Sequence, residues 1–443
     1  MSAPRKLNYL ILAISIALAT TASGTDRPDA GTLLRESTPP PLARPQPETP
    51  KLVPQQRLQD GTADGVKVKA AGFTFDGNTL FTGEQLSTLL AGYVGQELTL
   101  AQLNGVAEEI SAAYRAKGYF LASASIPPQT IKGGAAIHIH VTEGVLEGVY
   151  LEIKAAETRT PRSLLTSYIE RVPGDKPAEE GVLSDLVMRT NELPGISSRI
   201  SLESGSKAGT ARAQLEVTEG RPYSFTIDTD NHGNHSTGYY RTGATLELYS
   251  PLHLGDSFTL RGQSSYKASP SGETKTIQTG YSLPVSAHGT RAAFNYSFVD
   301  YELGKPFKDL DATGEAHNFT MTVAEPLIRS RGLILTATAG GEAKLLVDRT
   351  GSVGLVNKRH TVSGQAGMNG VEMDALLGGG STSFSLVYTN GVVAIDDPTT
   401  FTNDQSSTGL HTDGGYNKLA VSLSRNQNVY KALSFSTDRK SVV

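Results

Sequence analysis

Hydrophobic and polar residues follow different periods in the two halves of this chain. Up to about residue 220, short alternating segments are separated by apolar residues at helical spacing, such as Leu86, Leu89, Leu90 and Tyr93. From Arg221 onward the helical spacing stops, and apolar residues alternate with Ser, Thr, Asn and Gly. This change predicts small αβ units followed by a long series of antiparallel strands.

The αβ half is a duplicated unit. The tetrapeptide Val-Thr-Glu-Gly occurs at 141–144 and again at 217–220. Before the first copy, the pattern predicts β-α-α-β-β: a strand over 66–75, helices beginning after Thr82 and Thr99, and strands over 121–126 and 135–141. Before the second copy, the same order is predicted over 149–153, 161–169, 183–193, 196–202 and 211–217. A repeated unit indicates tandem domains over 66–144 and 145–220.

The alternating half predicts about ten strands over 221–443. A soluble sandwich also alternates, but three features favour a transmembrane β-barrel. The polar faces are rich in Ser, Thr, Asn and Gly, aromatic residues lie near strand ends, and the segments reach ten residues or more. A barrel also removes every open edge, which hydrocarbon requires. The alternative is a periplasmic or extracellular array of sandwiches.

The N-terminus has the pattern of a secretory signal peptide over 1–24. Arg5 and Lys6 precede an apolar stretch over 10–19, too short to span a membrane, and small residues follow it. The alternative is a short buried helix. Residues 25–65 are expected to form a proline-rich linker, with one or two helical turns over Gly31–Arg35.

Composition narrows the chemistry. The absence of cysteine excludes disulfides and thiolate catalysis. A net charge of -4 gives no indication of a basic surface that would bind nucleic acid. No nucleophile-elbow or phosphate-loop pattern occurs, and the glycine run 378–380 is expected in a hairpin turn. We therefore expect no enzyme activity, no cofactor and no metal.

Two polar clusters are candidate cation ligands. His138 and His140 share one face of a strand, but we expect them to face solvent while their neighbours fill the core. Asp228, Asp230 and His232 fit a lumen-facing strand end and a polar turn better than a cation site.

Several short motifs occur in a specific order. They lie at 73–81, 114–119, 126–129, 141–144, 193–196, 217–220, 230–233, 237–238 and 255–256. In this order they resemble the outer-membrane transporters of two-partner secretion, the haemolysin secretion/activation proteins of the POTRA-plus-barrel superfamily. The residues of these motifs expected to shape the fold are Asp76, Gly77, Asn78, Gly118, Tyr119, Pro128, Gln129, Gly144, Pro194, Gly195 and Gly220.

The resemblance implies an architecture and a function. It implies two periplasmic POTRA domains, a barrel of roughly 16 strands, and an N-terminal helix that can occupy the pore. It also implies recognition and export of a large secreted exoprotein, such as a haemolysin or adhesin, that carries an N-terminal secretion domain. The resemblance leaves open whether export also activates this partner, and it implies no nucleotide hydrolysis. Two alternatives stay open: a barrel-assembly factor of the same superfamily, and a secreted β-rich adhesin or enzyme with no membrane role.

The chain departs from this family in one respect. It shows about ten strands and lacks the family's Val-Arg-Gly-Tyr/Phe motif before Val443. The resemblance therefore predicts a C-terminally truncated chain, with about 110 further residues that carry strand patterns and an Arg-Gly-aromatic loop. The alternative is closure as a smaller, ten-stranded barrel.

By analogy with POTRA domains, the strand after the second helix lies at the sheet edge and can accept an extended peptide of the substrate. The alternative is that these strands only complete the fold. The candidate residues are Leu121, Ala122, Ser123, Ala124, Ser125 and Ile126 in the first domain, and Ile196, Ser197, Arg199 and Ser201 in the second.

Overall fold

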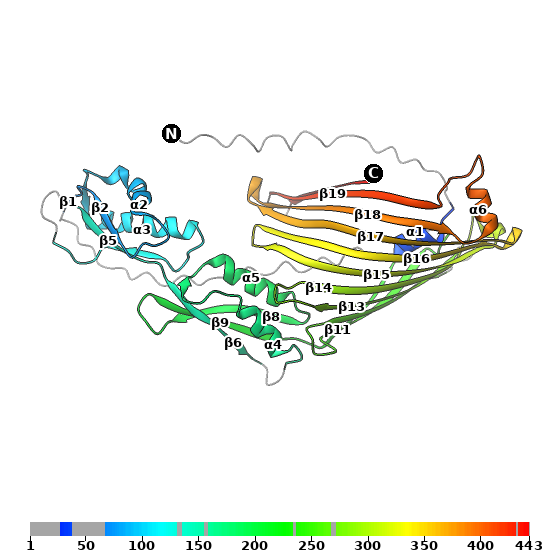
Figure 1. The fold of residues 1–443 in the computed structure, drawn as a ribbon, viewed down its shortest axis with the longest axis horizontal. Coiled ribbons are helices and arrows are strands. Elements are labelled where there is room, and N and C mark those ends of the chain that lie inside the picture. Colours follow the sequence, from blue (N-terminus) through cyan, green and yellow to red (C-terminus); the bar gives the residue numbers. More distant parts are fainter. Residues whose placement is uncertain are drawn as a thin grey trace.

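The computed structural model describes residues 27–37, 67–130, 135–154, 158–233, 236–266, 272–430 and 433–442. Figure 1 shows two small αβ domains at one end and a long, curved sheet at the other. The expected signal peptide over 1–24 and most of the proline-rich linker, residues 25–26 and 38–65, lie outside the described residues. Among the residues that are described, no helix is long and apolar enough to cross a membrane.

The first αβ domain has a three-stranded sheet in the order β2-β5-β4, with β2 parallel and β4 antiparallel to β5. Its elements are β1 (Lys67–Lys69), β2 (Phe73–Asp76), α2 (Gly83–Leu89), η1 (Ala91–Tyr93), β3 (Glu97–Thr99), α3 (Leu100–Ala116), β4 (Ser123–Ser125) and β5 (Ile137–Thr142). Thr82 and Thr99 start the two helices, because each forms a capping box with the glutamine three residues later.

The single first strand expected over 66–75 is wrong. It is two strands, and β1 pairs with β3 in a separate sheet instead of joining β5. The break lies at buried Ala70, whose N–H donates to the carbonyl of Gln96 and whose carbonyl accepts from Gly95. These bonds bend the chain between β1 and β2.

The second αβ domain has a four-stranded sheet in the order β7-β6-β9-β8. Its elements are β6 (Val145–Ile153), α4 (Arg162–Ile169), β7 (Lys176–Pro177), α5 (Glu180–Asn191), β8 (Ile196–Ser204) and β9 (Thr210–Glu219). Its core contains Leu165, Tyr168, Leu186 and Leu215, so the two helices cover one face of the sheet, as in the first domain.

The repeated glutamate explains the Val-Thr-Glu-Gly motif. Glu143 accepts hydrogen bonds from the N–H groups of Thr79 (2.6 Å) and Leu80 (2.8 Å) and from the hydroxyl of Tyr114 (2.9 Å). Glu219 likewise accepts from the N–H of Arg159 at 2.8 Å. In each domain, a carboxylate at the end of the last strand holds the loop that leads into the first helix.

The two αβ domains join with little slack. Only residues 143 and 144 separate β5 from β6. The Glu180 N–H donates to the Gly118 carbonyl at 2.8 Å, and the Ala178 N–H donates to the Gly144 carbonyl at 2.9 Å. Phe120 and Leu121 of the first domain also pack into a hydrophobic cluster of the second.

The large sheet has eleven strands, one more than the number expected, and every neighbouring pair is antiparallel. In order they are β10 (Tyr223–Asp230), β11 (Tyr240–Tyr249), β12 (Ser257–Tyr266), β13 (Glu273–Pro284), β14 (Arg291–Glu302), β15 (Ala312–Arg329), β16 (Leu333–Thr350), β17 (Leu355–Asp374), β18 (Gly380–Ile395), β19 (Gly414–Tyr430) and β20 (Leu433–Val442). The connections contain η2 (Lys308–Leu310), η3 (Gly351–Val353), η4 (Leu376–Gly378) and α6 (Pro398–Asp404). Of the glycine run 378–380, Gly378 and Gly379 lie in the β17–β18 turn and Gly380 begins β18.

Alternation divides this sheet into an apolar and a polar face. The apolar face carries half-exposed side chains at matching positions of neighbouring strands, for example Phe225 opposite Leu246, and Phe294 opposite Met321. The other face carries ion pairs between strands, such as Arg261 with Asp228 at 2.7 Å. Exposed apolar belts outside and polar side chains inside are the pattern of a membrane barrel wall.

We predict that Glu143→Ala destabilises the first αβ domain by about 3 kcal/mol, because several donors lose one charged acceptor. Hydrogen exchange at the Thr79 and Leu80 amides in the intact chain measures this loss as faster exchange. The control Glu84→Ala, on the exposed first turn of α2, should change stability by less than about 0.5 kcal/mol. Unchanged protection at both amides in Glu143→Ala would contradict the assignment.

The same carboxylate predicts an acid sensitivity. Burial alone raises the pKa of Glu143, but the hydrogen bonds from Thr79, Leu80 and Tyr114 outweigh it and leave the pKa below the ordinary value of 4.5. A depressed folded pKa contributes stability above the unfolded pKa, and that stability is lost as pH falls through the folded pKa. We expect the stability difference between wild type and Glu143→Gln to shrink below about pH 4.5 in unfolding titrations. A gap of constant size down to pH ~2 would be the contrary result.

Candidate functional site

Both candidate strands lie at sheet edges, β4 in the first domain and β8 in the second. The expected extent of the first is wrong, because β4 covers only Ser123–Ser125. Leu121 and Ala122 belong to the preceding turn, where the Ala122 N–H donates to the carbonyl of Tyr119 at 3.2 Å. Ile126 follows the strand and precedes Pro127, which disfavours continued pairing.

Side chains from the same domain cover part of each edge. The Ser111 hydroxyl of α3 accepts from the Ala124 N–H at 2.9 Å. The Asn191 carboxamide at the end of α5 accepts from the Ser198 N–H at 2.5 Å. These positions were not predicted from the sequence, because a serine or asparagine on a helix carries no pattern that reveals its partner strand.

The candidate side chains of β8 point in two directions. Ile196 is buried in the core, whereas Ser197 and Arg199 are exposed on the opposite face and Ser201 is half-buried. Arg199 donates to Glu216 of β9 at 2.7 Å. Hydrogen bonds from Lys154 and Arg199 lower the pKa of Glu216 to about 2. This face is therefore a stable charged surface.

The turn motif of the first domain is tightly packed. Asp76 ends β2, and Asn78 donates to the Phe81 carbonyl at 2.8 Å. Gly77 has φ +75, and a Cβ there would lie 2.1 Å from the carbonyl oxygen of Val141. Only glycine satisfies both conditions, so this motif serves the fold.

The remaining motif residues lie at the domain joints. Gly118 follows α3, and its carbonyl accepts a hydrogen bond from the Glu180 N–H of the second domain. Tyr119 packs against the hydrophobic core of the first domain. Pro128 precedes Gln129, whose carboxamide bonds the backbone of His138. At the joint between the second domain and the large sheet, Pro194 and Gly195 follow α5. The Gly220 N–H donates to the Gly195 carbonyl at 2.8 Å. A Cβ on Gly195 would lie only 3.2 Å from Tyr249 of β11.

The candidate cation ligands have protein partners. His138 and His140 are about half exposed and contact Asp76 at 3.2 and 3.0 Å. The hydrogen bond from His140 lowers the pKa of Asp76. Asp228 pairs with Arg261, and Asp230 pairs with Arg241 at 2.8 Å. Within the described ranges, no group of three His, Asp or Glu residues is placed to hold a metal ion.

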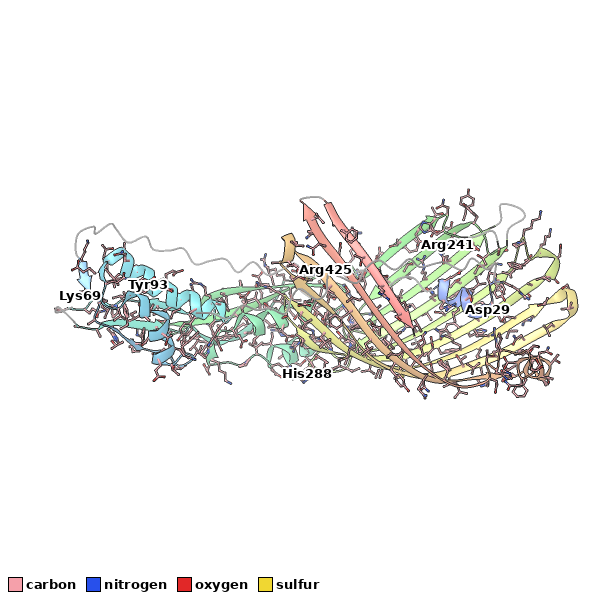
Figure 2. The ribbon with its side chains drawn as sticks, turned by 90° about the horizontal axis from the view of Figure 1, so that it is seen from above. Asp29, Lys69, Tyr93, Arg241, His288 and Arg425 are labelled. Carbon is pink, nitrogen blue, oxygen red and sulfur yellow. The ribbon has the colours of Figure 1, made fainter. Side chains whose placement is uncertain are left out.

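Helix α1 (Ala30–Ser37) covers the Gly31–Arg35 stretch and lies inside the curve of the large sheet (Figure 2). Its apolar residues are fully buried against β14, β15 and β16. The contact joins Ala30, Leu33 and Leu34 to Val299, Tyr301, Leu303, Ala312, Ala316 and Leu346. The helix lies at the end of the sheet opposite to the second αβ domain (Figure 1).

Polar contacts fix the start of α1. The Ala30 N–H donates to Asp348 of β16 at 2.8 Å. Arg359 of β17 bridges Asp348 at 2.9 Å and Asp29 at 3.0 Å. One arginine thus holds two carboxylates, one from the sheet wall and one from the segment that begins the helix.

The second αβ domain docks on turns at the near end of the sheet. Arg329, whose side chain is 4% exposed, contacts Glu192 at 3.0 Å. Arg331 contacts Glu180 at 2.5 Å, and Arg189 of α5 donates to the Ala287 carbonyl at 2.8 Å. Burial, followed by the charge of Arg329, lowers the pKa of Arg189 to about 10. Sequence reasoning missed this interface, because its residues lie up to about 150 positions apart.

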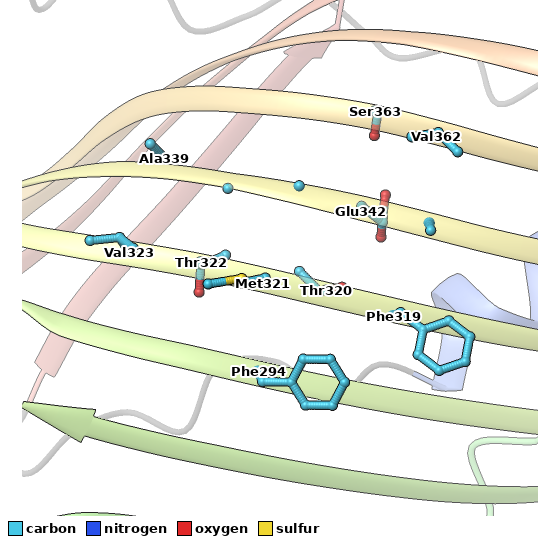
Figure 3. A pocket seen from close by; sticks show the side chains of 13 residues that line it. Phe294, Phe319, Thr320, Met321, Thr322, Val323, Ala339, Glu342, Val362 and Ser363 are labelled. Atoms are coloured by element: carbon cyan, nitrogen blue, oxygen red, sulfur yellow. The ribbon is translucent and has the colours of Figure 1, made fainter.

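The apolar face carries a shallow hollow of about 540 Å³ (Figure 3). Phe294, Phe319 and Met321 line it together with small residues of β16 such as Gly341. Nearly all of its lining is apolar, as expected for a surface in contact with lipid tails.

Comparison with known families gives two matches. Residues 209–439, just over half of the chain, match the haemolysin secretion/activation protein family ShlB/FhaC/HecB. Residues 68–144 match the POTRA domain of ShlB type. The two matched segments correspond to the first αβ domain and to the end of the second domain with the large sheet.

Individual proteins that match this chain are also named as transporters. The heme/hemopexin transporter protein HuxB of Haemophilus influenzae is 28% identical over 392 residues, which cover 85% of this chain and 67% of HuxB. The outer membrane transporter CdiB of Escherichia coli is 25% identical over 349 residues, covering 77% of this chain and 56% of CdiB. The solved structure of Escherichia coli CdiB has a TM-score of 0.62 at 21% identity, over 88% of this chain and 70% of that one, which shows the fold. The matched part of the chain thus spans about half to two thirds of the length of HuxB and CdiB.

We predict that Arg359→Gln loosens α1. A Leu33→Cys thiol in this cysteine-free chain should react slowly with a maleimide, because Leu33 is 3% exposed. Without Arg359, two carboxylates face each other and the labelling rate should rise about tenfold, as expected for the loss of about 1.4 kcal/mol. The control Arg349→Gln removes the pair with Glu315 on neighbouring strand ends and should leave the rate unchanged. Equal rates in both variants would show that the bridge does not hold the helix.

Proposed function

The chain belongs to the haemolysin secretion/activation protein family, and on this premise we propose that it exports a secreted exoprotein across the outer membrane. The family consists of outer-membrane transporters, and the POTRA domains lie on the periplasmic side. Transporters of this kind pair with one secreted partner. The POTRA domains are the two αβ domains described above, and the large sheet is the barrel wall.

One observation supports export most directly. The second POTRA domain is docked by ion pairs, one of them formed by the nearly buried Arg329, on the end of a sheet whose apolar face is outside and whose polar face is inside, and the first POTRA domain is joined directly to the second. A substrate captured by the POTRA domains is therefore held next to the mouth of a polar conduit. Helix α1, which packs against the inner wall, closes this conduit at rest.

The partner is a large exoprotein of the haemolysin or adhesin class, recognised through an N-terminal secretion domain. Such a substrate reaches the periplasm as an extended, β-prone chain. An extended chain can add to the open edge of a POTRA sheet through main-chain hydrogen bonds. Contact of this kind is weak and repeatable, which suits a chain that must be released into the pore.

The transporter carries out no chemical step of its own. The lumen-facing carboxylates Asp228, Asp230 and Asp348 each form an ion pair with an arginine, which supports a structural role for them. The outer apolar belt contacts outer-membrane lipid, and neither nucleic acid nor nucleotide takes part. Folding of the exoprotein outside the cell contributes the direction of transport.

Export predicts a secretion phenotype. Cells that lack this chain should retain the partner, namely the exoprotein of the same genome that carries a secretion domain, and expression of this chain should return it to the medium. Quantitative immunoblots of medium and periplasm measure both. Undiminished secretion in its absence would refute the proposal, and a general loss of other outer-membrane barrels would indicate a barrel-assembly factor instead.

A further inference from the structure

The backbone of edge strand β8 can be assigned a direction residue by residue. In an antiparallel ladder, alternate residues turn their N–H and C=O toward the neighbouring strand, and the others turn them outward. The Gly220 N–H donates to the Gly195 carbonyl, so Gly195 and the odd-numbered residues after it face β9. The outward-facing residues of β8 are therefore Ile196, Ser198, Ile200, Leu202 and Ser204, and the Ile196 N–H already donates to the Leu193 carbonyl at 3.2 Å.

Asn191 already occupies one of these positions. Its Oδ1 accepts from the Ser198 N–H at 2.5 Å, and its Nδ2 approaches the Ser198 carbonyl at 3.4 Å. A carboxamide carries a donor and an acceptor, as a peptide group does. Asn191 thus stands where the next strand would pair with Ser198. In the described ranges, no side chain accepts from the N–H of Ile200, Leu202 or Ser204.

The first POTRA domain covers its corresponding edge more fully. In β4 only Ala124 turns outward, and Ser111 holds its N–H at 2.9 Å. Beyond the end of β4, the Gln129 carboxamide accepts from the backbone N–H of His138 on β5 at 2.9 Å and donates to its carbonyl at 2.7 Å. Two polar side chains from outside the sheet therefore take the places that an added strand would need.

We propose that the second POTRA domain accepts the substrate strand, at Ile200–Ser204 of β8, and that Asn191 sets its register by stopping the pairing before Ser198. This inference rests on the proposed export function. The occupant is an extended exoprotein segment with alternating apolar and polar residues. Its apolar side chains face Phe120, Leu121 and Leu183, which form one cluster with Ile200 and Leu202.

Peptide binding to the full chain in detergent tests the register. The probe is a fluorescent ten-residue peptide of alternating Val and Thr with terminal Lys, and the same peptide N-methylated at alternate residues. Asn191→Ala exposes one more pair of backbone groups, so we expect five- to tenfold tighter binding, on the order of 1 kcal/mol. The control Thr190→Ala removes a buried hydroxyl that donates to the Leu186 carbonyl and a buried methyl group, keeps the contact between Asn191 and Ser198, and should not tighten binding. N-methylation should weaken binding at least tenfold.

Cross-linking tests which domain binds, and it uses no change at Asn191. A cysteine-bearing version of the peptide should form a disulfide with Glu203→Cys on β8 and much less with Ser125→Cys on β4, both exposed positions. Preferential reaction at Ser125→Cys would overturn the choice of domain. Binding that is sensitive to N-methylation but unchanged by Asn191→Ala would overturn the register role and leave strand addition standing. Binding indifferent to N-methylation would refute strand addition itself.

Discussion

Every strand in this molecule is subject to one constraint: its backbone N–H and C=O groups need partners. Unpaired groups cost several kcal/mol in hydrocarbon, so neighbouring strands of the large sheet pair along up to 18 residues. In water the constraint is weaker, and the POTRA domains meet it locally. Ser111, Gln129 and Asn191 each replace part of a missing strand. The same requirement leads to long, fully paired strands in the membrane sheet and to POTRA sheet edges that side chains cover in part.

Ion pairs join separate elements in two places, the lumen and the junction of the second POTRA domain with the sheet. In the lumen, single arginines bridge carboxylates of separate segments, as Arg359 does between Asp29 and Asp348. At the junction of the second POTRA domain with the sheet, Arg189 and Arg329 are nearly buried beside Asp185 and Glu192. Removing one partner of a buried pair is costly because the other charge is left unpaired. Both arrangements therefore hold separate elements in one defined position.

The sequence predicted most elements by periodicity but few of the contacts between them. The helix starts at Thr82 and Thr99 are visible because a capping box is local. The outward and inward faces of strands such as β14 are visible because alternation has a period of two. The break at Ala70 was missed, since it depends on bonds to Gly95 and Gln96 in a later loop. The candidate edge residues of the second domain lie on β8, but in the first domain only Ser123, Ala124 and Ser125 lie on β4. Which of their N–H groups have a partner depends on helix side chains that no periodicity connects to them.

The short join between the POTRA domains has a mechanical consequence. With two residues between β5 and β6 and main-chain bonds at Gly118 and Gly144, the join leaves little room for independent rotation. We therefore expect the two POTRA domains to move as one body, which Arg329 and Arg331 attach to the β15–β16 turn through the second domain. Under the proposed function, a force applied to the first domain by an incoming substrate chain would be transmitted to the β15–β16 turn. The two strands joined by this turn lead to the residues against which α1 packs.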